Sequence, residues 1–148
     1  MNYTVVIILF INFLSLFSFA ADRKSEQDSV KNVYVSDTDK LLTIHKLSVL
    51  PVTDNVNGLY SRSVENKLNT LVKNSHRFEL NEVKDADPRP TLEDYENNPE
   101  LIKQLGNKYN TDAFIGAKIL KAPKNISIVV DLFLKRDGNV IIQEQISK

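Results

Sequence analysis

Apolar residues alternate along this chain between strand-like and helix-like spacing, and that order constrains the fold more than any other feature. Residues 40–52 are rich in branched side chains and form the first expected strand. Residues 60–72 repeat apolar positions at helical spacing, and residues 77–83 alternate as a second strand. A second helix and a third strand at 113–120 follow. Strands joined through helices run parallel, and right-handed crossovers in opposite directions from the first strand put the two helices on opposite faces.

The second helix has two starting signals. Thr91 precedes an acidic turn as an N-cap residue, and Asn98 followed by Pro99 repeats the signal more strongly. The buried face of this helix is expected to carry Leu101, Ile102, Leu105 and Tyr109.

Two further strands, at 126–134 and 140–146, end the chain. Asp137-Gly138 lies between them and is a strong hairpin signal, so these strands add to the sheet as a meander. The sequence therefore predicts an α/β fold: a three-layer α/β/α domain whose five-stranded mixed sheet has the strand order 2-1-3-4-5.

The N-terminal segment, residues 1–20, is interpreted as a secretory signal peptide. Residues 5–19 are almost wholly apolar, and Ser18 and Ala20 give the small residues of a cleavage site, with the cut after Ala20. The run is short for a membrane span, so no stable membrane insertion is expected after cleavage. An uncleaved anchor is the alternative, because no Lys or Arg precedes the apolar run.

Behind the signal peptide, residues 21–40 are expected to form a flexible polar leader and residues 41–148 the folded domain. Lys+Arg and Asp+Glu both number 19, and this balance argues against a nucleic-acid-binding surface. The chain has no cysteine, which excludes disulfides and lipidation at a cleavage-site cysteine. An exported domain without disulfides favours a bacterial periplasmic location.

No catalytic or cofactor motif is present in the sequence. The four glycines form neither a G-x-G pair nor a phosphate-binding loop, and no G-x-S-x-G occurs. His45 and His76 are interpreted as ordinary histidines and not as metal ligands. Acidic residues between 85 and 96 suggest acid/base catalysis or calcium binding, but a solvated loop before an acidic helix start explains them more simply. We therefore expect no enzyme activity, no cofactor and no metal.

The pattern of elements resembles the amino-terminal domain of TolB and, more broadly, the envelope group that includes LpoB and CsgG. The matching segments are residues 47–52, 75–80, 105–116 and 129–134, with Asp137-Gly138. The resemblance covers roughly residues 41–146 and implies a non-enzymatic domain that binds other proteins of the cell envelope. LpoB and CsgG are lipoproteins, which this cysteine-free chain cannot be.

Two surfaces are candidates for partner binding. Residues 126–134 carry apolar side chains on both faces, and two crossover helices would cover the last strands poorly. One hypothesis is an apolar patch for a partner; the alternative, which we prefer, is that the leader or the second helix covers it. The second candidate is the edge of the last strand, 140–146, which could accept a partner strand. The expected patch residues are Phe114, Val129, Phe133 and Ile141.

These observations predict a periplasmic protein-interaction module with envelope proteins as partners. The competing hypothesis is a small-ligand-binding or enzymatic domain that uses the loops after the strands, where open α/β sheets usually bind ligands.

Overall fold

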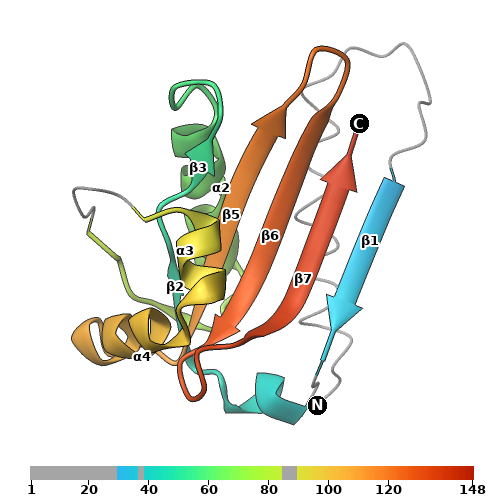
Figure 1. Cartoon of the computed structure of the whole chain (residues 1–148). Helices are drawn as coiled ribbons and strands as arrows, with labels where there is room; N and C mark the ends of the chain where they lie inside the picture. The colour runs from blue at the N-terminus through green and yellow to red at the C-terminus, as the bar shows by residue number, and fades with distance from the viewer. Residues whose placement is uncertain (1–29, 37–38, 85–89) are drawn as a thin grey trace.

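The computed structural model describes residues 30–36, 39–84 and 90–148, which form a mixed α/β fold with one seven-stranded sheet and three α-helices (Figure 1). The strands are β1 (Val30–Val35), β2 (Lys46–Val49), β3 (Thr53–Asp54), β4 (Glu79–Leu80), β5 (Ala113–Lys121), β6 (Ile126–Leu134) and β7 (Val140–Ser147). The α-helices are α2 (Ser61–Asn74), α3 (Leu92–Asn97) and α4 (Pro99–Lys108), and a 3₁₀ helix spans Asp39–Thr43.

The strands lie in the order β1-β7-β6-β5-β2-β4, and β3 pairs with β5. The five expected strands take the expected order, with β2, β4 and β5 parallel and β5, β6 and β7 antiparallel. The expected count of five strands is wrong, because β1 and β3 also join the sheet.

The first expected strand, 40–52, is shorter than its apolar composition suggests. Its start is the 3₁₀ helix, and Pro51 ends the pairing because it has no backbone N–H to donate. Only the first part of β5 pairs with β2. After Pro51 the chain pairs with β5 again, as β3, where Thr53 lies opposite Lys118. The second expected strand, 77–83, likewise shrinks to the two residues of β4.

Part of the expected flexible leader is a strand. β1 pairs antiparallel with β7 along its whole length, from Val30 opposite Ser147 to Val35 opposite Ile142. The rest of the expected leader before residue 30, and the expected signal peptide, lie outside the described residues. Within the described part of the chain, no helix is both long and apolar enough to cross a membrane.

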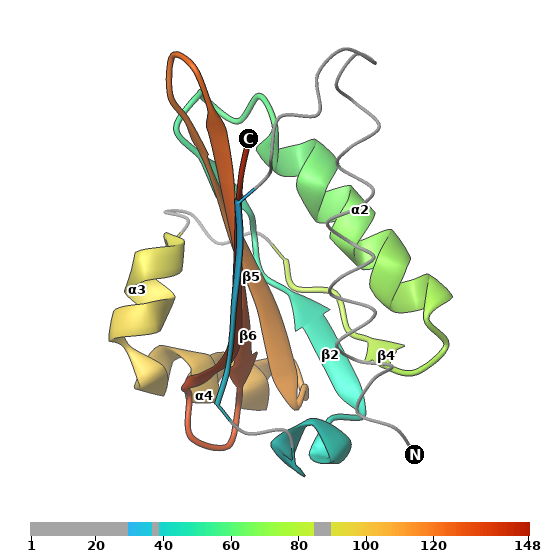
Figure 2. The same ribbon diagram turned by 90° about the vertical axis from the view of Figure 1, so that its right-hand side faces the viewer.

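Helices lie against both faces of the sheet, α2 on one side and α3 with α4 on the other (Figure 2). Helix α2 buries Val64, Leu68 and Val72, which pack in one cluster with residues on the facing side of the sheet. On the opposite face, Leu92, Tyr95 and Ile102 pack over Leu50, Phe114, Val129 and Phe133. The sheet is therefore apolar on both faces near β5 and β6.

Local signals fix where the covering helices begin. Thr91 and Asp94 form a reciprocal capping box at α3, and the Asn98 side chain accepts a hydrogen bond from the Leu101 N–H at α4. Asp54 binds the start of α2, because its carboxylate accepts backbone N–H bonds from Val56, Gly58, Tyr60 and Ser61 at 2.8–2.9 Å. These bonds hold the pKa of Asp54 below its usual value.

Candidate functional site

The four candidate patch residues are buried, and for three of them the alternative that helices cover the patch holds. Phe114 and Phe133 are 0% exposed, Ile141 1% and Val129 7%. Phe114, Val129 and Phe133 lie together under α3 and α4, and the Tyr95 ring meets Phe133 edge-on at 6.3 Å between centroids. Ile141 belongs to the cluster on the α2 face. A role in partner binding stays a prediction for all four, and for Phe114, Val129 and Phe133 it would require α3 to leave the sheet.

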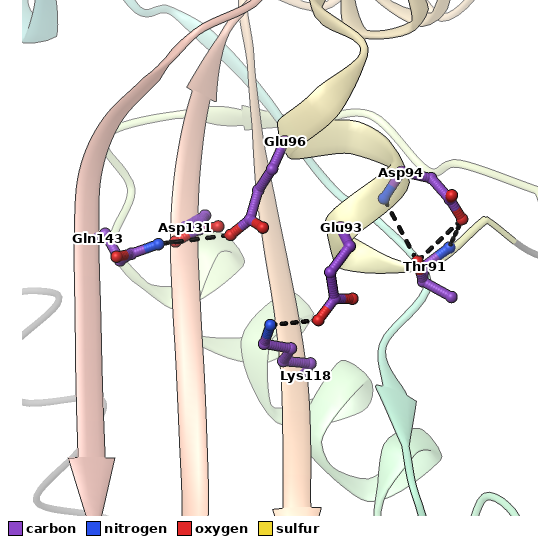
Figure 3. Close-up of polar contacts among 7 residues, drawn as sticks. All are labelled: Thr91, Glu93, Asp94, Glu96, Lys118, Asp131 and Gln143. Atoms are coloured by element: carbon purple, nitrogen blue, oxygen red, sulfur yellow. Dashed lines mark hydrogen bonds and ion pairs between the residues drawn. The ribbon is translucent and has the colours of Figure 1, made fainter.

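A buried carboxyl group lies beside this cluster (Figure 3). Asp131, in the middle of β6, is 0% exposed and stands opposite Gln143 of β7. The Gln143 Nε2 donates to Asp131 Oδ1 at 2.9 Å and to Glu96 Oε1 of α3 at 3.4 Å. The second oxygen of Asp131, Oδ2, has no hydrogen-bond partner among the described residues.

Burial and the carboxylate of Glu96 together raise the pKa of Asp131 to about 7, while the bond from Gln143 opposes the rise. Asp131 is thus protonated at mildly acid pH, when its O–H can bond to the facing Glu96. Strongly shifted carboxyls often mark catalytic sites, but α3 closes this one from solvent. Its geometry suits the attachment of a helix to the sheet better than proton transfer to a substrate.

A second polar contact links α3 to the sheet. Lys118 of β5 forms an ion pair with Glu93, and this bond holds the pKa of Glu93 below its usual value (Figure 3). Glu93, Asp94 and Glu96, three of the acidic residues singled out in the sequence, therefore have structural contacts. Asp85 and Asp87 lie outside the described residues. Among the described residues no His, Cys, Asp and Glu side chains cluster in a way that could hold a metal ion, and His45 and His76 are exposed.

On the opposite face, a hollow of about 500 Å³ lies between the start of α2 and the ends of β5, β6 and β7; we call it the α2 groove. The competing hypothesis from the sequence placed a ligand at loops after the strands, and this groove adjoins the carboxyl end of β5. Its lining residues are Tyr60, Ser63, Val64, Ile119, Lys121, Ala122, Pro123, Lys124, Asn125, Ile126, Ile128, Ile146 and Lys148.

The sequence suggested that the last strand forms the free edge of the sheet. In the structure the free long edge is β1. β7 lies between β6 and β1, and β1 pairs on one side only among the described strands. Ser36 N donates to Ile141 O at 2.9 Å, and bonding alternates along antiparallel strands, so the backbone groups of Val33 and Val35 point outward. The side chains of Val33 and Tyr34 are 46% and 61% exposed. We call this surface the β1 edge.

Sequence reasoning missed all three features for identifiable reasons. Asp131 is a single charged residue inside an apolar strand, which is a signal visible in the sequence, but its burial depends on the packing of α3. The α2 groove depends on the register of three strands, and the β1 edge on a short, mixed polar segment whose partner is distant in the chain. Neither can be derived from local periodicity.

Comparison with known proteins finds similarity of fold alone. No family model matches the chain, and no curated protein sequence matches it. The PelC dodecamer from Paraburkholderia phytofirmans is similar with a TM-score of 0.56 and 8% identity over 81% of this chain and 80% of that chain. The C-terminal domain of LpoB from Escherichia coli gives a TM-score of 0.50 and 11% identity over 72% of this chain and 84% of that chain. The likeness to LpoB agrees, for the fold, with the resemblance in the sequence.

Proposed function

We propose that this chain is an exported, non-enzymatic protein-interaction module of the bacterial cell envelope that works in the periplasm. The observation that carries the proposal is the β1 edge, a six-residue strand with outward backbone groups and two exposed apolar side chains. The fold supports it as well: PelC, a fold neighbour, is an assembly of twelve copies. The apolar N-terminal run supports export.

The mode of binding follows from the geometry of the edge. A partner strand would continue the sheet by bonding to the outward N–H and C=O groups of Val33 and Val35. Val33 and Tyr34 lie on opposite faces of β1, so the partner would meet one apolar side chain on each face. Other proteins protect such edges with short strands, charges or proline; β4, the opposite edge, has only two residues.

The proposal is tested by photo-cross-linking in living cells that produce the full chain. A benzophenone amino acid replaces Tyr34 on the β1 edge, and a matched variant carries it at Lys73, an exposed residue at the end of α2. We expect one envelope protein to be cross-linked from position 34 and not from position 73. Identical products from both positions, or none from position 34, would contradict an interaction through this edge.

A further inference from the structure

The floor of the α2 groove consists of two rows of side chains that run across three strands. Ile119, Ile128 and Ile146 are register partners on β5, β6 and β7, and they form an apolar inner row. One step toward the strand ends, Lys121 pairs with Ile126, and Ile126 exchanges backbone hydrogen bonds with Lys148 at 2.8 and 2.9 Å. Because side chains two residues apart share a face, both rows face α2.

Helix α2 and the β5–β6 turn form the other walls. Tyr60, Ser63 and Val64 from the first turns of α2 face the isoleucine row, and residues 122–125 close the end. The volume of about 500 Å³ lies within the roughly 300–1,000 Å³ of small-molecule sites. The groove is therefore a hollow with an apolar base and room for a small ligand.

The charged side chains around this hollow have one sign. Lys121, Lys124 and Lys148 line it, and no acidic side chain does. Within residues 30–36, 39–84 and 90–148, the ammonium groups of these lysines take part in no ion pair. Apolar floor and basic rim are arranged in successive rows, which matches a molecule with an apolar tail and an anionic head.

We propose that the α2 groove binds a single-chain anionic amphiphile of the fatty-carboxylate class. The hydrocarbon chain lies along the isoleucine row against Val64, and the carboxylate reaches the row that holds Lys121 and Lys148. Burial of methylene groups supplies most of the affinity, and the lysines select the charge of the head group. This site is on the opposite face from Asp131, and no described residue of β1 lines it, so it does not depend on the proposed protein partner.

The test is calorimetric titration of the purified protein with dodecanoate below its micelle concentration. We expect saturable binding at one site, with decanoate about tenfold weaker for two fewer methylenes. Uncharged 1-dodecanol and the double variant Lys121→Gln/Lys148→Gln should each lower the affinity about fivefold. The control for charge is Lys67→Gln/Lys73→Gln, which removes two exposed lysines of α2 that do not line the groove.

A second pair of variants tests the location. Ser63→Trp fills the groove from α2, whereas Asn66→Trp places the same ring on an exposed residue of α2 that does not line it. We expect Ser63→Trp to abolish dodecanoate binding and Asn66→Trp to leave it unchanged, with circular dichroism showing both folded. Absence of saturable binding to the unaltered protein, or equal binding by these two variants, would overturn the proposal.

Discussion

At the scale of single residues, the buried carboxyl of Asp131 has an environment that departs far from that of an ordinary aspartate. Its pKa of about 7 lies above the usual 3.8 because the carboxyl is buried and faces Glu96. The folded state therefore keeps a proton that the unfolded chain loses above pH 4. The stability that this proton contributes is complete below about pH 4 and is lost as the pH rises through 7.

Substitution Asp131→Asn makes this dependence measurable. The amide keeps the shape, can accept from Gln143 and donate toward Glu96, and does not titrate. Between pH 5 and pH 8, the free energy of unfolding of the unaltered protein should fall relative to the variant by about 2–3 kcal/mol, as urea titration would show. Parallel curves for the two proteins would show that Asp131 is ionised in the fold. Glu96→Gln should reduce the pH dependence of the free energy of unfolding only in part, because the Asp131 carboxyl remains buried.

At the scale of elements, the β6–β7 hairpin and the start of α4 fit together through a glycine. Gly138 has φ +76°, and a Cβ there would lie 2.1 Å from the backbone O of Pro99. Gly138→Ala should therefore cost about 3 kcal/mol or more in thermal or urea unfolding. Gly58→Ala is the matched control, because φ is +79° but the nearest atom is 3.6 Å away. It should cost only about 1 kcal/mol; equal losses would mean that the contact with Pro99 is not tight.

Elements with local signals were predictable from the sequence. The helical spacing behind α2, the caps Thr91 and Asn98, and the Asp137-Gly138 turn each depend on neighbouring residues, and the structure confirms them. Elements that depend on distant partners were not. β1 has little apolar alternation and is a strand because β7 pairs with it more than 100 residues later.

At the scale of the whole molecule, the right-handedness of crossovers predicted the order of the five expected strands. It did not predict how closely the helices pack on the sheet. The expected second helix is two helices, α3 and α4, and α3 carries Leu92 and Tyr95 over Phe114 and Phe133. Gly116 permits this approach, since a Cβ there would be 2.6 Å from Leu92 Cδ1. The sequence left the coverage of the candidate patch open, and the close contact between Leu92 and Gly116 is what the pattern of elements could not show.

The burial of that patch moves the expected partner surface from a face of the sheet to its edge. Phe114 and Phe133 belong to the core, and the surface that we propose for a partner is the β1 edge, which ends the sheet beside β7. The function proposed here thus depends on outward backbone groups, and side chains set only specificity. Removal of one outward N–H should therefore weaken binding while the fold stays intact.

The most direct measurement is partner capture by Val33→Pro compared with Tyr34→Ala, each purified from cells after cross-linking. Proline at position 33 removes an outward N–H, whereas Tyr34→Ala removes an exposed side chain and keeps every backbone group. We expect Val33→Pro to lose the partner and keep its unfolding midpoint, while Tyr34→Ala retains most of the partner. Undiminished capture by a folded Val33→Pro variant would contradict strand addition at the β1 edge.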